Sequence, residues 1–187
     1  MAAVSGLEPE APTLFLVVLG GRTNRSYIEL HDVRFVAGHT IDDTLPELRR
    51  KWFGMRKGLH LDSYMAVRAV DGYAVQLRRE PPAPRDERLW FVNLGAYRPD
   101  SLAELHHFGL VVARSPQAAR AQAKHQWLVG ALQQHKDDLC SVDDCLAVEQ
   151  LELGGPTAWH VHLEPHPEGL SQPQVPDWWG YRLIDRC

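Results

Sequence analysis

Histidines and carboxylates gather at two places in the first half of the sequence, and their types and spacing could do chemistry. Glu29, His31 and Asp32 fall close together, and His60 and Asp62 follow with one residue between them. A carboxylate beside an imidazole fixes its tautomer and can make it a general base, and the same side chains are metal ligands. The candidate catalytic residues are therefore His31, Asp32, His60 and Asp62.

A second group of histidines lies near the end of the chain. His160 and His162 would point to the same side of a strand, and a His-x-His pair can bind a metal. An exposed strand with polar residues on one face is the simpler interpretation, so these are weaker candidates and no metal is expected. No cofactor is expected either, because the sequence lacks a glycine-rich nucleotide loop, a nucleophile elbow and a CxxC motif.

An internal repeat predicts the elements that would position these residues. Residues 14–54 align with residues 89–129 at a constant offset of 75 and without a gap. About ten aligned positions are identical, whereas unrelated sequences of average composition would share roughly two or three. The identical pairs include Gly20 with Gly95, Glu29 with Glu104, His31 with His106, and Trp52 with Trp127. The sequence thus predicts two copies of one unit, copy 1 over residues 14–80 and copy 2 over residues 88–165.

The two copies differ at the positions that could do chemistry. Copy 2 has His107 where copy 1 has Asp32, and it has no counterpart of His60. We therefore expect any site to lie in copy 1 or to join the two copies unequally. The candidate ligand-binding residues are Glu29, His31, His106 and His107.

Local signals in each copy predict the order strand, short turn, strand, helix, strand, strand. Apolar runs closed by glycine predict the first strands. These are Leu14–Leu19 and Leu89–Leu94. Thr40, with Asp43 three residues on, predicts a capping box at the helix start of copy 1. Ser115 followed by Pro116 predicts the helix start of copy 2.

Glu29 also has a structural interpretation. Ser26 and Glu29 have the S-x-x-E spacing of a capping box, in which the serine caps a helix and the glutamate reaches back to it. Ser101 and Glu104 repeat that spacing. We therefore expect a short helical turn in each copy, with His31 near the end of its turn, where it can bond the last carbonyls. The second strands would then be Val33–Ala37 and Phe108–Ala113.

The last quarter of each copy is expected to be a hairpin, with Asp71-Gly72 as a strong turn signal in copy 1. The fold class is then α+β, with one main helix against a four-stranded sheet in each copy (β-β-α-β-β). A unit this small buries little surface alone. The two copies are therefore expected to pack as a pseudo-dimer about a pseudo-two-fold axis.

Three further segments flank or connect the copies. Residues 1–13 are expected to form a loose N-terminal arm, and residues 81–87 a proline-rich linker. Residues 166–187 form a C-terminal tail that contains Trp178-Trp179-Gly180-Tyr181. Exposing so many aromatic rings to water is unfavourable, so the tail is expected to pack back on the body.

Four segments of copy 1 form a recognisable pattern. They are Ile28-Glu29-Leu30-His31-Asp32-Val33-Arg34-Phe35-Val36, Trp52-Phe53-Gly54, Leu59-His60-Leu61-Asp62 and Asp71-Gly72-Tyr73. With these segments the chain resembles a bacterial family known only as a domain of unknown function, which occurs as one or two tandem copies per protein. The resemblance implies a two-copy member of that family, and it implies no activity.

Size and charge restrict the class of protein. The chain of 187 residues is 44% hydrophobic and 24% charged, as in ordinary globular proteins. A net charge of −4 argues against nucleic-acid binding, and the apolar run Leu14–Leu19 is too short to span a bilayer. We predict a cytoplasmic location, because no basic cluster precedes that run and the odd number of cysteines suggests no disulfide framework.

The function predicted from the sequence is binding rather than catalysis. The duplication and the lack of a catalytic motif favour a non-enzymatic module that holds a small ligand or a protein in a groove between the copies. The alternative is a small hydrolytic or metal-assisted enzyme centred on His31, Asp32, His60 and Asp62. No nucleic-acid or membrane partner is expected. The protein would be a monomer with an internal pseudo-dimer, or a weak homodimer.

Overall fold

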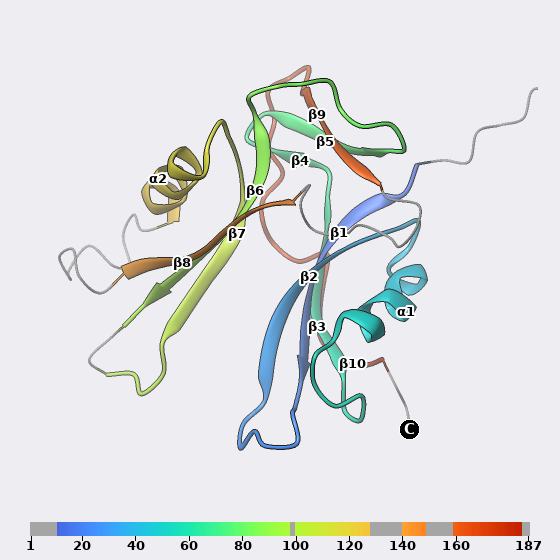
Figure 1. Cartoon of the computed structure of the whole chain (residues 1–187), viewed down its shortest axis with the longest axis vertical. Coiled ribbons are helices and arrows are strands. Elements are labelled where there is room, and N and C mark those ends of the chain that lie inside the picture. Colours follow the sequence, from blue (N-terminus) through green and yellow to red (C-terminus); the bar gives the residue numbers. More distant parts are fainter. Residues whose placement is uncertain (1–10, 98–99, 128–139, 149–158, 185–187) are drawn as a thin grey trace, which may run out of the picture.

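The computed structural model describes residues 11–97, 100–127, 140–148 and 159–184, which contain two helices and ten strands (Figure 1). Copy 1 contains β1 (Thr13–Gly21), β2 (Leu30–Gly38), α1 (Ile41–Lys51), β3 (His60–Val67), β4 (Ala69–Val70) and β5 (Tyr73–Arg78). Copy 2 contains β6 (Arg88–Ala96), β7 (Leu105–Ala113), α2 (Pro116–Trp127), β8 (Cys140–Ala147) and β9 (His160–Pro165). The tail adds β10 (Trp178–Leu183).

Each copy builds an antiparallel sheet with its first strand in the middle. In copy 1, β1 lies between β2 and β3, and in copy 2, β6 lies between β7 and β8. Gly20 of β1 is opposite His31 on one side and His60 on the other. Gly95 takes the same place in β6. The edge strand β10 pairs with β3 and extends the sheet of copy 1.

Both sheets have an irregularity at the same step of the ladder. The register of β1 with β3 shifts between Val18 and Leu19, which leaves Asp62 as the extra residue of β3. The register of β6 with β8 shifts at the corresponding step, between Asn93 and Leu94. Such bulges redirect side chains and are common beside functional sites. The repeat thus includes the distortion that positions Asp62.

The structure does not confirm a four-stranded sheet within each copy. Instead, β4 and β5 form a separate three-stranded sheet with β9 of copy 2. The predicted hairpin turn is confirmed, with positive φ angles of 49° at Asp71 and 80° at Gly72. The Asp71 carboxylate accepts hydrogen bonds from Val112 N and Gln122 Nε2 of copy 2, both at 2.7 Å. These bonds fix the hairpin to the other copy rather than to its own sheet.

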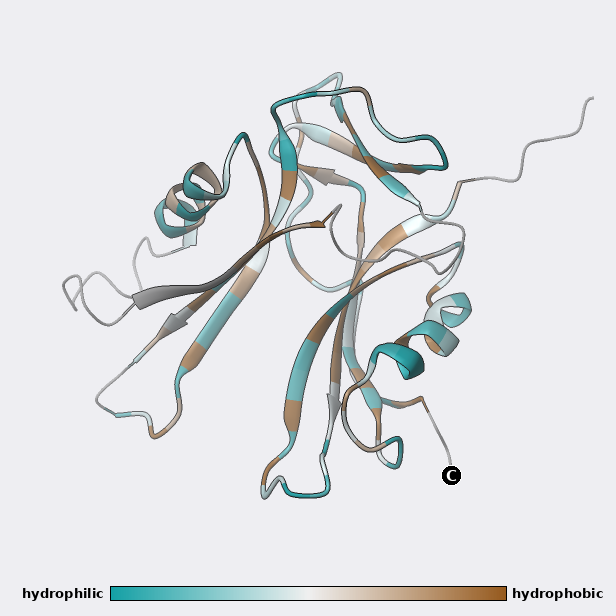
Figure 2. Cartoon of the chain, viewed as in Figure 1, coloured by the Kyte–Doolittle hydropathy of each residue, from teal (hydrophilic) through white to brown (hydrophobic). Residues whose placement is uncertain are grey.

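Apolar side chains fill three core clusters. One lies between the sheet of copy 1 and α1, a second between the sheet of copy 2 and α2, and the third is shared by the two copies. Figure 2 shows hydrophobic and hydrophilic residues alternating along β2 and β7, as expected for strands with one face towards a core. The shared cluster includes Leu14, Leu16, Val67, Leu89 and Leu110.

The predicted helix starts are confirmed. Thr40 Oγ1 accepts a hydrogen bond from Asp43 N at 3.4 Å, and Asp43 Oδ2 accepts one from Thr40 N at 2.8 Å. Ser115 Oγ accepts a hydrogen bond from Ala118 N at 3.1 Å. The C-cap of α1 is Trp52, whose side chain is buried against the helix and the sheet. Neither helix in the described ranges has the length and apolar character needed to cross a membrane.

The predicted helical turn before β2 is wrong. Residues 22–29 form an irregular loop, in which Ser26 Oγ accepts a hydrogen bond from Thr23 N at 3.0 Å. Residues 100–104, before β7, contain no helix either. The antiparallel ladder extends to the pair Gly21 and Leu30, so ladder hydrogen bonds replace those of a turn. His31 therefore belongs to β2, and the Glu29 side chain has another partner.

Candidate functional site

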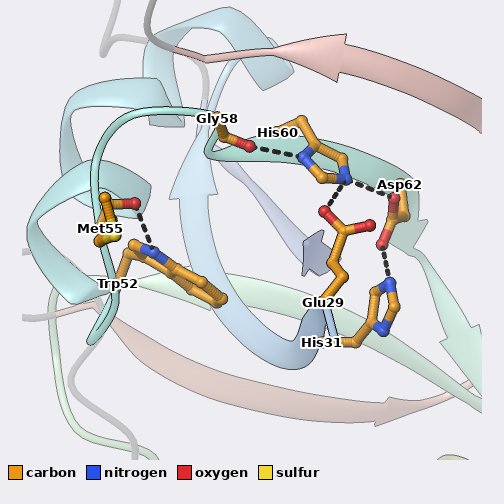
Figure 3. Close-up of polar contacts among 7 residues, drawn as sticks. All are labelled: Glu29, His31, Trp52, Met55, Gly58, His60 and Asp62. Carbon is orange, nitrogen blue, oxygen red and sulfur yellow. Dashed lines mark hydrogen bonds and ion pairs between the residues drawn. The ribbon is translucent and has the colours of Figure 1, made fainter. Parts of the chain in front are cut away.

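His60, the first residue of β3, is the centre of a polar cluster in copy 1 (Figure 3). Its side chain is only 1% exposed. The Nδ1 atom lies 2.8 Å from Gly58 O, whereas Nε2 lies 3.3 Å from Glu29 Oε1 and 3.2 Å from Asp62 Oδ1. Because a carbonyl oxygen only accepts hydrogen bonds, Nδ1 carries the proton in the contact with Gly58 O.

Asp62 connects His60 to a second histidine. Its other carboxylate oxygen, Oδ2, lies 3.3 Å from His31 Nε2. The His31 side chain is 56% exposed and that of Asp62 is 29% exposed. The contacts therefore run from a buried imidazole to one at the surface. We call these four residues the His60 cluster: Glu29, His31, His60 and Asp62.

Both ring nitrogens of His60 face oxygen atoms. Nδ1 faces the Gly58 carbonyl, and Nε2 faces the carboxylates of Glu29 and Asp62. Both carboxylates keep contact with solvent, since their side chains are 38% and 29% exposed. The cluster therefore fixes the His60 ring and orients Asp62 between His60 and His31.

Two residues from distant parts of the sequence enclose the His60 ring. A Cβ atom on Gly20 would lie 2.4 Å from His60 Nε2 and 3.0 Å from Asp62 Oδ2, so a larger residue would displace the cluster. Tyr181 of β10 packs against the ring, with centroids 4.0 Å apart and planes at 34°. The tail strand thus contributes one wall of the site.

Trp52 supports the loop that leads to His60. Its Nε1 donates to Met55 O at 3.0 Å (Figure 3), and Met55 N donates to Arg22 O at 2.7 Å. The side chain is buried in the core between α1 and the sheet of copy 1. The repeated tryptophan therefore shapes the approach to β3 as well as the core.

Asp32 does not join the His60 cluster. It alternates with His31 along β2 and so lies on the other side of the strand. Its carboxylate pairs with Arg34 and accepts a hydrogen bond from Val33 N at 2.9 Å. Burial raises the pKa of the Asp32 carboxyl above its ordinary value, and the Arg34 guanidinium and the Val33 N–H offset part of that rise. The other three candidate catalytic residues do meet, together with Glu29.

Copy 2 carries a different contact at the corresponding place. His106 Nε2 lies 3.8 Å from Glu104 Oε2, and the His106 side chain is 48% exposed. The ladder position of His60 is occupied by Ser141. His107, at the position of Asp32, places its ring 5.2 Å from that of Trp127. The repeat therefore preserves the His–Glu pair of residues but not the buried imidazole.

The histidines of β9 lie away from this cluster, in the sheet shared by the copies. His160 pairs with Arg78 and His162 with Gln76 in the ladder, and His162 Nε2 lies 2.9 Å from Glu80 O. Among the residues that the structure describes, no three His, Cys, Asp or Glu side chains are arranged to hold a metal ion.

Two cavities lie between the copies, and we call this space the inter-copy groove. The larger has a volume of about 380 Å³ and is bordered by residues of both copies, including His31, Phe35, Phe91, His106 and Phe108. The smaller has a volume of about 270 Å³ and is bordered by residues that include Val18, Met65, His106, His107 and Pro176. His31 thus belongs to the His60 cluster and also borders the groove.

A family model described as "Domain of Unknown Function (DUF1543)" matches residues 26–77 and 101–150, which together make up more than half of the chain. The chain belongs to this family. The two matched segments agree with the two tandem copies that the resemblance implied. The first segment of this DUF1543 chain contains the whole His60 cluster, and the second contains Glu104 and His106.

A solved structure is also similar to this DUF1543 chain. It is the crystal structure of a protein Il1583 from Idiomarina loihiensis, with a TM-score of 0.71 and 41% sequence identity. The match covers 93% of this chain and 99% of that one. No curated protein matches the chain in sequence.

Sequence reasoning missed two residues of the site in this DUF1543 chain. Gly20 was interpreted only as the end of a strand, although a glycine within a strand also signals a close approach of other atoms. Tyr181 had no local signal that would connect it to His60, because the contact depends on where β10 pairs. Glu29 was a candidate from the sequence, but its contact with His60 was not predicted.

Proposed function

We propose that this DUF1543 protein binds a small molecule with an apolar body in the inter-copy groove. The observation that carries the proposal is the cavity of about 380 Å³, because both copies contribute to its wall. That volume lies within the range of small-molecule sites, about 300–1,000 Å³. Its apolar lining consists of Val18, Val33, Phe35, Phe91, Phe108 and Leu146.

A few polar residues border the same cavity and would orient the ligand. They include His31, Asp32, Arg34, Asn93 and His106, and Asp32 forms an ion pair with Arg34. Sites of this kind combine apolar walls with a small number of placed polar groups. Arg34 is always charged and donates only, and imidazoles can donate as well. The ligand is therefore expected to carry a hydrogen-bond acceptor beside its apolar body.

The pairing of β5 with β9 supports a pseudo-two-fold relation between the copies, which we infer on this basis. Gln76 and His162 are opposite each other in the ladder, and they are equivalent in the repeat at an offset of 86. On either side of this pair, each residue of one copy faces the repeat equivalent of the residue that its own counterpart faces, as in an isologous contact. These pairs are Ala74 with Glu164 and Arg78 with His160. An internal pseudo-dimer of this kind would form one groove per chain.

Binding of anilinonaphthalene sulfonate, an anionic dye that fluoresces in apolar surroundings, tests the proposal. Val18 borders both cavities, so Val18→Trp should fill the groove and weaken binding of the dye about tenfold or more. Leu170→Trp adds the same side chain at a position that is 53% exposed and borders neither cavity. The control should bind as the unmodified protein does. Equal binding by all three proteins, each shown to be folded by circular dichroism, would contradict the proposal.

One observation also favours the enzymatic alternative, in which His31, His60 and Asp62 take part in a reaction. The three side chains are in contact, and His31 borders the larger cavity. A positioned imidazole beside a ligand cavity is the arrangement that general acid–base catalysis requires.

A further inference from the structure

We propose that His31 is a general base that activates water for the hydrolysis of an ester held in the inter-copy groove. The inference rests on the proposed binding function, because the ester would occupy the cavity proposed for the ligand. In this arrangement His31 is the catalytic residue. Asp62 and His60 are positioning residues that act through it.

The contacts of His31 identify which of its nitrogens is basic. Nε2 lies 3.3 Å from Asp62 Oδ2, and a carboxylate only accepts hydrogen bonds. The proton of the neutral ring therefore lies on Nε2, and Nδ1 keeps its lone pair. The carboxylate also stabilises the imidazolium that forms when Nδ1 takes a proton, as in other carboxylate–histidine pairs.

Contacts with two histidines orient Asp62. Its Oδ1 atom lies 3.2 Å from His60 Nε2, and His60 is fixed in turn by Gly58 O at 2.8 Å. The Gly20 backbone lies close to His60 and Asp62, and Tyr181 packs against the His60 ring. A catalytic histidine benefits from such an oriented partner, because it enters the reaction already aligned.

The residues around the cavity indicate the nucleophile. Ser63 borders the smaller cavity, whereas the larger one, which His31 borders, has no Ser, Thr or Cys among the described residues of its wall. Water is therefore the attacking group that we assign to the larger cavity. His31 Nδ1 takes a proton from the water as its oxygen bonds to the ester carbonyl carbon. The bond from that carbon to the alcohol oxygen then breaks, and His31 returns the proton to the leaving alkoxide. The products are one carboxylic acid and one alcohol, and His31 is regenerated.

The same cavity also indicates the class of ester. Its walls include Phe35, Phe91 and Phe108, which suit an aliphatic or aryl group next to the ester bond. Arg34 and Asp32 border the cavity as an ion pair, so together they add no net charge to its wall.

Hydrolysis of p-nitrophenyl butyrate by the full-length protein tests the inference. His31→Ala should lower kcat/KM about 100-fold or more, whereas His125→Ala, at an exposed position on α2, should leave it unchanged. Free imidazole should restore activity to His31→Ala in a saturable manner, which damage to the fold would not allow. Asp62→Asn should lower kcat about tenfold with little change in KM, because the base is formed but is poorly oriented.

Other outcomes would overturn the inference. These are hydrolysis no faster than in buffer, equal rates for His31→Ala and the unmodified protein, or activity that needs an added divalent metal. Hydrolysis that Val18→Trp does not reduce would place the activity outside the groove and would also overturn it. If the dye binds the groove but the ester is not hydrolysed, this inference fails alone. If the dye does not bind the groove, the proposed binding function fails.

Discussion

Copy 1 and copy 2 pair their strands in the same register, yet they carry different side chains at one position of the ladder. Opposite the glycine of the central strand, copy 1 places His60 and copy 2 places Ser141. Both copies keep the bulge, the helix cap and the repeated tryptophan. The backbone of the unit therefore does not require the buried imidazole, which points to a role for His60 beyond the fold.

The histidines that border the groove extend the comparison. His31 and His106 occupy equivalent positions, border the same cavity and have similar side-chain exposure, 56% and 48%. Among the contacts that the structure describes, His31 Nε2 lies 3.3 Å from Asp62 Oδ2 and His106 Nε2 lies 3.8 Å from Glu104 Oε2. Comparing His31 with His106 therefore tests how contact with the His60 cluster changes the reactivity of an imidazole.

The largest expected effect on stability comes from His60→Ala. The change removes a buried ring, leaves a cavity and removes one contact from each of two carboxylates, so the free energy of unfolding should fall by about 3 kcal/mol. Ser141→Ala changes the same ladder position of copy 2 and should cost less than about 1 kcal/mol, because a serine has few atoms to lose. Urea unfolding measures both. Equal losses would show that the two positions have the same role.

A somewhat smaller effect is expected from Gly20→Ala. The added Cβ would lie 2.4 Å from His60 Nε2, and an overpacked position of this kind costs about 2 kcal/mol. Gly95→Ala in copy 2 should lower the free energy of unfolding by less, since the residue opposite Gly95 in β8 is Ser141 rather than a histidine. The decisive measurement is a double-mutant cycle, in which Gly20→Ala should cost little once His60→Ala has removed the ring. Additive losses would contradict the close approach.

The helix caps should show the smallest differences in stability between the copies. Thr40→Ala and Ser115→Ala each remove one side-chain cap, so each should cost about 1 kcal/mol by thermal or urea unfolding. Thr40 also binds the carboxylate of Asp43, whereas Ala118 at the matching position of α2 has none. A loss confined to one helix would show that the caps are not equivalent.

The Asp43 carboxylate makes the cap of α1 sensitive to pH. Hydrogen bonds from the backbone and the side chain of Thr40 hold the pKa of Asp43 below its ordinary value. A carboxyl whose pKa is lowered by folding adds stability above its unfolded pKa of about 3.9, and this stability is lost as the pH falls through its lower folded pKa. Asp43→Asn should therefore be less stable than the unmodified protein near neutral pH, and the difference should shrink on acidification. A difference that stays constant with pH would contradict this account.

Local patterns predicted the elements well where the local structure depends on residues that are close in the sequence. The Thr40 cap, the Ser115 cap and the Asp71-Gly72 turn all follow from short-range chemistry. The S-x-x-E spacing at Ser26 predicted a helical turn that is absent from the described residues 22–29. Ladder pairing between β1 and β2 extends to Leu30 and replaces that turn. A capping motif does not decide the structure where a neighbouring strand offers the backbone other partners.

The site was only partly predictable for the same reason. His31, His60 and Asp62 were candidates from their residue types, and Asp32 was grouped with them only because it is adjacent to His31. Alternation along β2 separates these two neighbours. The contacts of Gly20 and Tyr181 with His60 depend on which strands pair. The sheet of β4, β5 and β9 likewise depends on long-range contacts that no local pattern encodes.

The central claim, that the His60 cluster makes His31 different from its repeat equivalent, is tested most directly by carbethoxylation with diethyl pyrocarbonate. The reagent reacts with the unprotonated imidazole, so the rates at His31 and His106 are measured by mass spectrometry at about pH 8, above the ordinary range of histidine. We predict that His31 reacts several-fold faster than His106, and that Asp62→Asn removes the difference. Equal rates in the unmodified protein, or a difference that survives Asp62→Asn, would contradict the account.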